Sequence, residues 1–149
     1  MLESVMFITR KTDYAIRSIL YLCEKKNKIV DVNEIAKQKL IPKIFLSKIL
    51  QKLCKKGVVK SLKGKKGGFY LAKDPSKLTL MEIIEIMQGP ISINICVVNK
   101  RRCKLSNLCS VHPIWVNLRE EMEEKFKRIT FEELIIKEKK LKRRKSWLK

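Results

Sequence analysis

The stretch GVVKSLKGKKGGFYLA, residues 57–72, constrains the fold more than any other part of the chain. Two short runs of strand-forming residues, 58–62 and 69–72, flank six residues that comprise three lysines and three glycines. Glycine reaches the positive φ angles that a tight connection needs, so the pattern predicts a β-hairpin. The tip of this hairpin is cationic because it carries Lys63, Lys65 and Lys66.

Two helical patterns begin the chain. The first runs from Thr12 to about Glu24, where apolar residues recur at helical spacing. Its expected buried stripe consists of Ala15, Ile16, Ile19, Leu20 and Cys23. The second begins at DVNE, residues 31–34, which has the form of a capping box, and it ends near Lys39.

A third helical pattern lies directly before the hairpin. It opens at Pro42, because proline is harmless at the first helical position, and it closes at Gly57. Its expected inner face is Phe45, Leu46, Ile49, Leu50 and Leu53. The opposite face carries cations and small hydrogen-bonding side chains: Lys43, Ser47, Lys48, Gln51, Lys52 and Lys55. Three helices followed by a hairpin form the winged helix-turn-helix pattern, which places such a face in a DNA major groove.

The second half of the chain predicts further helices. Thr79 and Glu82 cap a helix that Gly89-Pro90 ends, with Leu80, Ile83, Ile84 and Met87 facing inward. Helix restarts at Pro113, and the apolar residues of this helix are Trp115, Leu118, Met122, Phe126 and Ile129. We interpret this long amphipathic helix as a dimerisation helix, the alternative being that it packs only within its own chain.

The expected fold is therefore mainly α with a small β-hairpin wing, divided into four segments. Residues 1–75 form the winged helix-turn-helix DNA-binding domain, and residues 76–112 form a connecting helix and a cysteine-containing loop. Residues 113–136 form the dimerisation helix and a short last helix, which Thr130 caps. The remaining residues, 137–149, are expected to be a solvated or frayed basic tail.

The charge of the chain indicates a polyanionic partner. Lysine and arginine number 35 against 15 acidic residues, which gives a formal net charge of +20. No apolar run approaches the roughly 20 residues that a membrane-spanning helix needs, and the first residues lack the order of a signal peptide. We therefore expect a cytoplasmic, nucleic-acid-binding protein. It is not expected to be an enzyme, because no nucleophile–base pair, phosphate-binding glycine loop or paired carboxylates are evident.

A few residues are candidates for reading DNA bases. Lysine donates to guanine and glutamine pairs bidentately with adenine, which selects Lys43, Ser47, Lys48 and Gln51. Lys52 and the three hairpin lysines complete the expected DNA-binding set through phosphate or minor-groove contacts. A two-fold dimer would require a roughly palindromic operator. The alternative is that these lysines only solvate a helix face.

Three of the five cysteines and the only histidine lie in residues 96–112, CVVNKRRCKLSNLCSVH. Thiolates are soft ligands that suit iron–sulfur units, and neighbouring Lys and Arg side chains would offset their negative charge. Core cysteines have no reason to gather in a polar loop. In contrast, Cys23 and Cys54 lie on predicted helices and are interpreted as core residues.

Three stretches of the chain together resemble the Rrf2 family of bacterial winged-helix transcription regulators. They are TRKTDYAIRSILYLC at residues 9–23, the segment from EIAKQ to IMQG at residues 34–89, and the three-cysteine loop. The resemblance runs from about Met6 to Leu134 and is most specific at KGKKGGFYL. The family usually has arginine where this chain has Lys63, and arginine fits a narrow minor groove better than lysine.

The resemblance implies a metal site. In the iron–sulfur members of the family, the IscR-like and NsrR-like regulators, three cysteines placed like Cys96, Cys103 and Cys109 bind a cluster at the dimer interface. The spacing here is C-x6-C-x5-C, one residue longer in the first interval than the commonest pattern. Operator binding by a homodimer would then depend on an iron–sulfur cluster.

The resemblance leaves the fourth ligand open. His112 matches the histidine of IscR-like proteins, which hold a [2Fe-2S] cluster, and its alternative role is a cap or surface imidazole before Pro113. Asp13 matches the aspartate that reaches a [4Fe-4S] cluster from the partner chain in NsrR-like proteins, and otherwise it is a first-turn helix carboxylate. The same DNA-binding dimer with a thiol switch or a Cys3His zinc site, and a basic RNA-associated protein, remain the alternatives.

Overall fold

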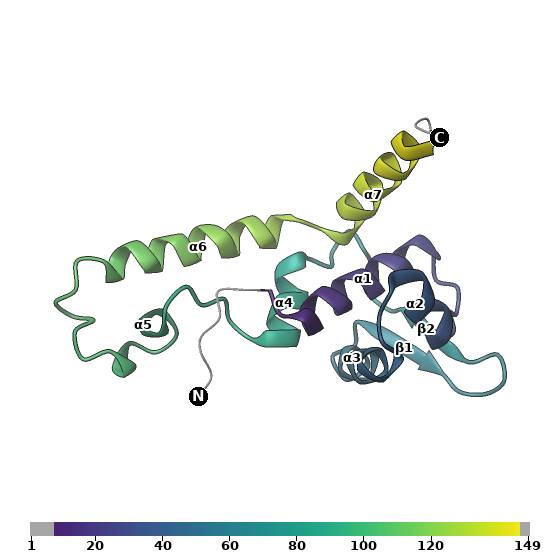
Figure 1. Ribbon diagram of the computed structural model, residues 1–149, viewed down its shortest axis with the longest axis horizontal. Helices are drawn as coiled ribbons and strands as arrows, with labels where there is room; N and C mark the ends of the chain where they lie inside the picture. Colours follow the sequence, from purple (N-terminus) through teal and green to yellow (C-terminus); the bar gives the residue numbers. More distant parts are fainter. Residues whose placement is uncertain (1–7, 147–149) are drawn as a thin grey trace.

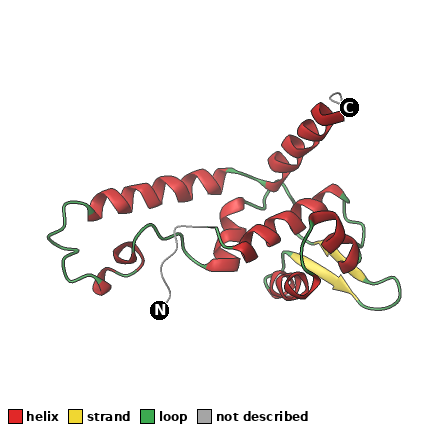
Figure 2. Ribbon diagram, viewed as in Figure 1, coloured by secondary structure: helices red, strands yellow, loops and turns green. Residues whose placement is uncertain are grey.

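The fold is mainly α with one two-stranded hairpin, as predicted (Figures 1 and 2). A computed structural model describes residues 8–146 of the protein. The winged part consists of α1 (Arg10–Glu24), α2 (Val32–Lys39), α3 (Lys43–Lys55), β1 (Val59–Leu62) and β2 (Gly68–Leu71). The second half consists of α4 (Leu80–Gln88), α5 (Ile95–Val98), the 3-10 helix η1 (Lys100–Arg102), α6 (His112–Arg128) and α7 (Phe131–Ser146).

Side-chain caps begin α1, α2 and α4. The Thr9 hydroxyl accepts from the Thr12 amide at 3.2 Å, which starts α1. The predicted caps Asp31 and Thr79 accept from amides two and three residues later, at 2.8 Å and 3.2 Å. The capping-box prediction for Glu34 is wrong, because its carboxylate instead accepts from the Tyr21 hydroxyl at 2.7 Å. This hydrogen bond ties α2 to α1 and lowers the pKa of Glu34.

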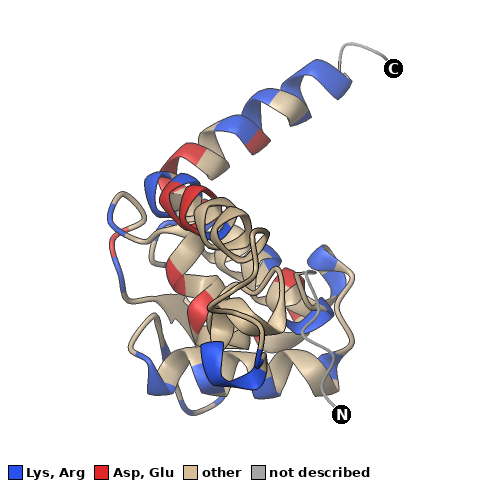
Figure 3. Ribbon diagram, turned by 90° about the vertical axis from the view of Figure 1, so that its left-hand side faces the viewer, with Lys and Arg blue, Asp and Glu red and all other residues tan. Residues whose placement is uncertain are grey.

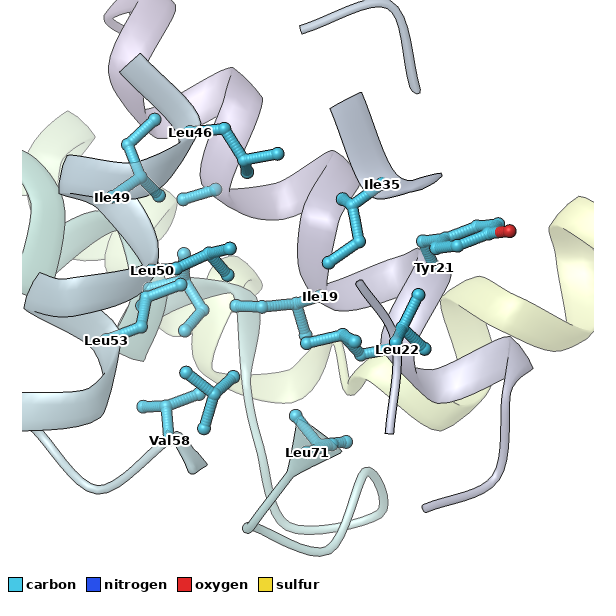
Figure 4. Packing of buried hydrophobic residues seen from close by; sticks show 14 of the residues in the cluster. Ile19, Tyr21, Leu22, Ile35, Leu46, Ile49, Leu50, Leu53, Val58 and Leu71 are labelled. Atoms are coloured by element: carbon cyan, nitrogen blue, oxygen red, sulfur yellow. The ribbon is translucent and has the colours of Figure 1, made fainter. Parts of the chain in front are cut away.

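The main core lies where α3 packs against α1. Figure 4 shows α3 residues directed toward Ile19 and Leu22 of α1. The fully or nearly fully buried α3 residues are Leu46, Ile49, Leu50 and Leu53, all of them predicted. Phe45 was expected on this inner face, but 48% of its surface is exposed. Helical geometry explains the difference, since Phe45 lies to one side of the row that Leu46 and Leu50 define.

The wing is attached to the α1–α2 connection next to its turn, at the start of β2. Val59 pairs with Leu71 and Leu62 with Gly68 in the antiparallel register. Val30 and Phe69 also exchange backbone hydrogen bonds of 2.9 Å and 2.8 Å. A Cβ on Gly68 would lie 2.3 Å from the Val30 carbonyl oxygen, so only glycine fits this approach. The start of β2 is therefore held against Val30, and the lysines of the turn that precedes it are exposed.

The start of α7 belongs to the winged core. Phe131 is fully buried, and its amide donates to the Leu78 carbonyl at 2.9 Å. The amide of Leu80 donates to the Ile129 carbonyl at 2.9 Å, so the segment before α7 pairs with the segment before α4. Ile135 is also buried. The start of α7 therefore contributes to the hydrophobic core of the winged part.

For the residues that the structure describes, the prediction of a short last helix is wrong, and so is the frayed alternative for the basic tail from Lys137. The solvated alternative agrees with the structure, because residues 137–146 are exposed except for the half-buried Glu138. Helix α7 continues to Ser146, and residues 147–149 lie outside the described part of the chain. Lysine, arginine and leucine are strong helix formers. Two ion pairs also hold α7 against the winged part: Glu138 with Lys39 at 2.9 Å and Lys142 with Glu24 at 3.0 Å.

Helix α6 extends away from the winged part (Figure 1). Met122 and Phe126, two residues of its predicted seam, pack against a small cluster of Met81, Ile84 and Ile91. Nearer its start the seam is more open, and 40% of the surface of Leu118 is exposed. Part of the apolar seam thus packs within its own chain. Within residues 8–146, no helix combines the length and the apolar character needed to cross a membrane.

Candidate cysteine site and DNA-binding face

Short side-chain-to-backbone hydrogen bonds organise the cysteine loop. The side chain of Asn94 accepts from the Ile95 amide at 2.7 Å and starts α5, and Asn99 accepts from the Arg101 amide at 3.0 Å and starts η1. The buried Ser106 hydroxyl lies 2.8 Å from the Cys103 carbonyl oxygen. These contacts give a polar loop a defined conformation without a core of its own.

The two ends of the loop meet at Cys96 and His112. Cys96 lies on α5 and is buried, and His112 is the first residue of α6. The Nδ1 atom of His112 lies 3.2 Å from the Cys96 Sγ atom. Nearby, the Arg119 guanidinium donates to the Val97 carbonyl at 2.9 Å and fastens α5 to α6. The structure therefore brings together two of the four predicted ligands of this loop.

The other predicted ligands are placed differently. Cys103 and Cys109 are half-buried in the same loop. Asp13 lies on α1, where its carboxylate pairs with the Arg17 guanidinium at 2.6 Å. Across residues 8–146, His, Cys, Asp and Glu side chains form no preassembled group of three or more that could hold a metal ion. The donor types nevertheless suit soft metals, since the loop supplies three free thiols and one imidazole.

The two helical cysteines are core residues, as predicted. Burial raises the pKa of the Cys23 thiol to about 12 and also raises the pKa of Cys54. Both side chains pack against the main core. Neither belongs to the loop, so the cysteines of the chain lie in two separate parts of the fold.

Cys23 is expected to resist alkylation by iodoacetamide at pH 7.5 in the folded protein. Only the thiolate reacts, and a pKa of about 12 leaves almost none of it at this pH. Mass spectrometry of quenched samples should show slow labelling of Cys23 in buffer and fast labelling in denaturant. Equal rates in the two conditions would contradict the assignment of Cys23 to the core.

The predicted DNA-binding residues lie on α3 and on the hairpin that packs beside it. Helix α3 and the hairpin lie side by side in Figure 1, and Figure 3 shows basic residues along α3 at the lower edge of the view. The exposed residues of the predicted set are Lys43, Lys48, Gln51, Lys52, Lys63, Lys65 and Lys66. Ser47 is half-buried, and its hydroxyl donates to the Lys43 carbonyl at 3.0 Å.

One basic residue beside this face was missed by sequence reasoning. Lys11 of α1 lines a cavity of about 210 Å³ together with Lys48 and Lys52 of α3. The predictions for α3 included both of these lysines. No local signal in the sequence joins Lys11 to them, because the contact depends on how α1 packs against α3.

Comparisons with known proteins agree with this architecture. Residues 8–137 match the Rrf2 family, described as iron-dependent transcriptional regulators. An HTH-type transcriptional regulator of Aquifex aeolicus is 38% identical over 132 residues, which cover 87% of this chain and 92% of the relative. The regulator NsrR of Bacillus licheniformis is 32% identical over 108 residues, covering 71% and 76%. The solved structure of CymR, the global cysteine regulator of B. subtilis, superposes with a TM-score of 0.71 at 24% identity, covering 91% and 97%.

Proposed function

This chain belongs to the Rrf2 family of transcriptional regulators, and from that premise we propose that it is a homodimer whose binding to operator DNA depends on an iron–sulfur cluster. The observation that carries the proposal is the contact between the Cys96 Sγ and His112 Nδ1 atoms at 3.2 Å. Cys103 and Cys109 of the same loop would complete a set of three thiolates and one imidazole. When bound, such a cluster supplies reversible redox chemistry.

The second copy of the chain is proposed to bind along α6 and the cysteine loop. Apolar side chains are exposed there without cover from their own chain: Leu105, Leu108, Ile114 and Leu118. An exposed apolar surface of this kind marks an interaction site. A two-fold dimer built on α6 would present two copies of α3 to two half-sites of an operator.

Helix α4 connects the loop to the DNA-binding face. The Gln88 side-chain oxygen at its end accepts from the Thr9 amide at 3.0 Å and from the Thr12 hydroxyl at 2.7 Å. The Lys52 ammonium of α3 donates to the Met87 carbonyl at 3.3 Å. Gly89 follows at once with a φ of 82° and turns the chain toward the loop. A conformational change of the cysteine loop would therefore be transmitted to α1 and α3 through the last turn of α4. The dimer would then have two conformations that differ in operator affinity.

The fourth ligand is expected to be His112 rather than Asp13. His112 already contacts Cys96, whereas the Asp13 carboxylate is paired with Arg17. Replacing His112 with alanine should lower the iron content of the anaerobically reconstituted protein, and replacing Asp13 with alanine should not. Iron per subunit and visible absorbance measure both effects.

A further variant shows whether iron is lost because a ligand is missing at position 112 or because the fold is disturbed there. His112→Cys supplies another soft ligand at the first residue of α6, so it should recover part of the bound iron. Full iron content in the His112→Ala protein, with loss of iron in Asp13→Ala, would instead establish Asp13 as the fourth ligand.

The proposal is tested by purification and reconstitution without oxygen, followed by analysis of iron, acid-labile sulfide and zinc. The operator is identified by selection from random DNA with the same preparation. Iron and sulfide in equal amounts, together with selection of a palindromic sequence, are the expected results. A protein without iron and sulfide after reconstitution would rule out the cluster.

A zinc site or a thiol switch is the second candidate for the same loop. The Cys96–His112 pair is also half of a tetrahedral Cys3His zinc site. Bound zinc without sulfide would favour this candidate, and operator affinity that responds to thiol oxidation without any metal would favour the switch. A preference for structured RNA, or equal affinity for random and selected DNA, would indicate an RNA-associated protein.

A further inference from the structure

A cavity of about 210 Å³ opens where the start of α1 meets α3 and the end of α4. Its described lining residues are three lysines and three apolar side chains: Lys11, Lys48, Lys52, Phe45, Ile49 and Met87. No carboxylate is among them. The cavity lies beside the exposed face of α3 that is proposed to enter the DNA major groove.

The apolar residues shape the cavity, and the lysines supply its charge. Ile49 is 3% exposed, whereas Phe45 is 48% exposed and turns aside from the core row. The hydrogen bond from the Lys52 ammonium to the Met87 carbonyl, 3.3 Å long, directs this cation toward α4. Lys11 reaches the same cavity from α1. Cations from two helices therefore converge on one small space.

The electrostatics of this space favour an anion. The positive charges of neighbouring lysines repel one another, and an anion bound between them removes this repulsion. The N-terminal end of α1 adds the positive end of a helix dipole, because Lys11 is its second residue. Glu82 and Glu85 line a neighbouring groove that also includes Lys52, so they offset that cation from its other side. Lys11, Lys48 and Lys52 all line the cavity, and Glu82 and Glu85 lie beside only the last of them.

We propose that this cavity holds one backbone phosphate of bound DNA, with Lys11, Lys48 and Lys52 as its contacts. The inference rests on the proposed function, since it requires that α3 enters the major groove. It divides the roles on α3: Lys48 and Lys52 fix the position of the DNA, whereas Lys43 and Gln51 are left to read bases. It also extends the DNA contact to α1.

The first test is the salt dependence of operator binding by Lys11→Gln. The slope of log Kd against log salt concentration should fall by about 1, because one phosphate contact is lost. The loss of affinity should be the same for operator and random DNA, which leaves the specificity ratio unchanged. The matched control is Lys140→Gln, an exposed lysine of α7, which should leave the slope unchanged. An unchanged slope for Lys11→Gln, or an equal fall in the control, would overturn the inference.

The second test locates the phosphate. Operator duplexes that carry one neutral methylphosphonate at successive positions are titrated with wild-type protein and with Lys11→Gln. At one position per half-site, the methylphosphonate should weaken binding by the wild-type protein. At the same position it should not weaken binding by Lys11→Gln any further. If the two losses add at every position, no phosphate contacts Lys11 and the inference is wrong. Failure of the wild-type protein to prefer any DNA sequence would instead remove the proposed function itself.

Discussion

Replacing Cys103 with serine is expected to abolish cluster binding and to remove the dependence of operator affinity on the cluster. Cys103 is a proposed thiolate ligand, and a serine hydroxyl at neutral pH is a poor substitute for a soft ligand. In the wild type, the loaded and empty forms should differ in operator affinity by about 5–150-fold, the usual range of coupling between two sites. In Cys103→Ser the ratio should be about 1. Iron analysis and fluorescence anisotropy with a labelled operator measure the two effects.

The control for this experiment is Cys23→Ala, which removes a thiol from α1 and leaves the loop intact. Cys23 is half-buried against the core, and burial raises its pKa to about 12. The control should therefore keep its iron and its affinity ratio. Retention of both properties by Cys103→Ser would contradict the proposed ligand set.

Replacing Phe131 with alanine should lower the free energy of unfolding by about 3–5 kcal/mol, the range for deleting a buried aromatic ring. Phe131 is fully buried in the winged core although it begins α7, more than half the chain away from α1. Urea denaturation followed by circular dichroism, at one protein concentration, measures the change.

The matched control is Ile136→Ala on the same helix. Ile136 is 48% exposed, so its truncation should change the free energy of unfolding by about 0.5 kcal/mol or less. Equal, small effects of both substitutions would mean that α7 is an appendage rather than part of the core. The Phe131 result thus decides whether the first 75 residues are a complete domain.

The features that sequence reasoning predicted correctly depend on local chemistry. Thr79 begins α4 through a bond to an amide three residues away, and Gly89 ends the same helix with a positive φ. Gly57 ends α3 in the same way, with a φ of 71°. The hairpin also follows from neighbouring residues, because its glycines and strand formers lie within one short stretch.

The features that sequence reasoning missed depend on contacts between distant residues. Helix α7 continues to Ser146, and its pairs with Lys39 and Glu24 join residues about a hundred positions apart. The exposure of Phe45 depends on the orientation of α3 about its own axis relative to α1. Hydrophobic periodicity alone does not determine that orientation. Lys11 was overlooked for the same reason.

Sequence reasoning selected the residues of the candidate site but could not give their arrangement. Cys96 and His112 were both named as ligands, and the structure places their side chains in contact. The placement of Cys103 and Cys109 depends on turns in the loop that follow no helical or strand period. Within residues 8–146 the structure has no preassembled group of metal ligands. The spacing of the cysteines in the sequence did not indicate this.

Native mass spectrometry of the protein, purified and reconstituted without oxygen, tests the central claim most directly. The predicted result is a dimer whose mass exceeds that of two polypeptides by two iron–sulfur clusters. Two irons in each cluster would agree with His112 as the fourth ligand, and four would agree with Asp13. A monomer, or a dimer with the mass of the polypeptides alone or with zinc, would contradict the proposal.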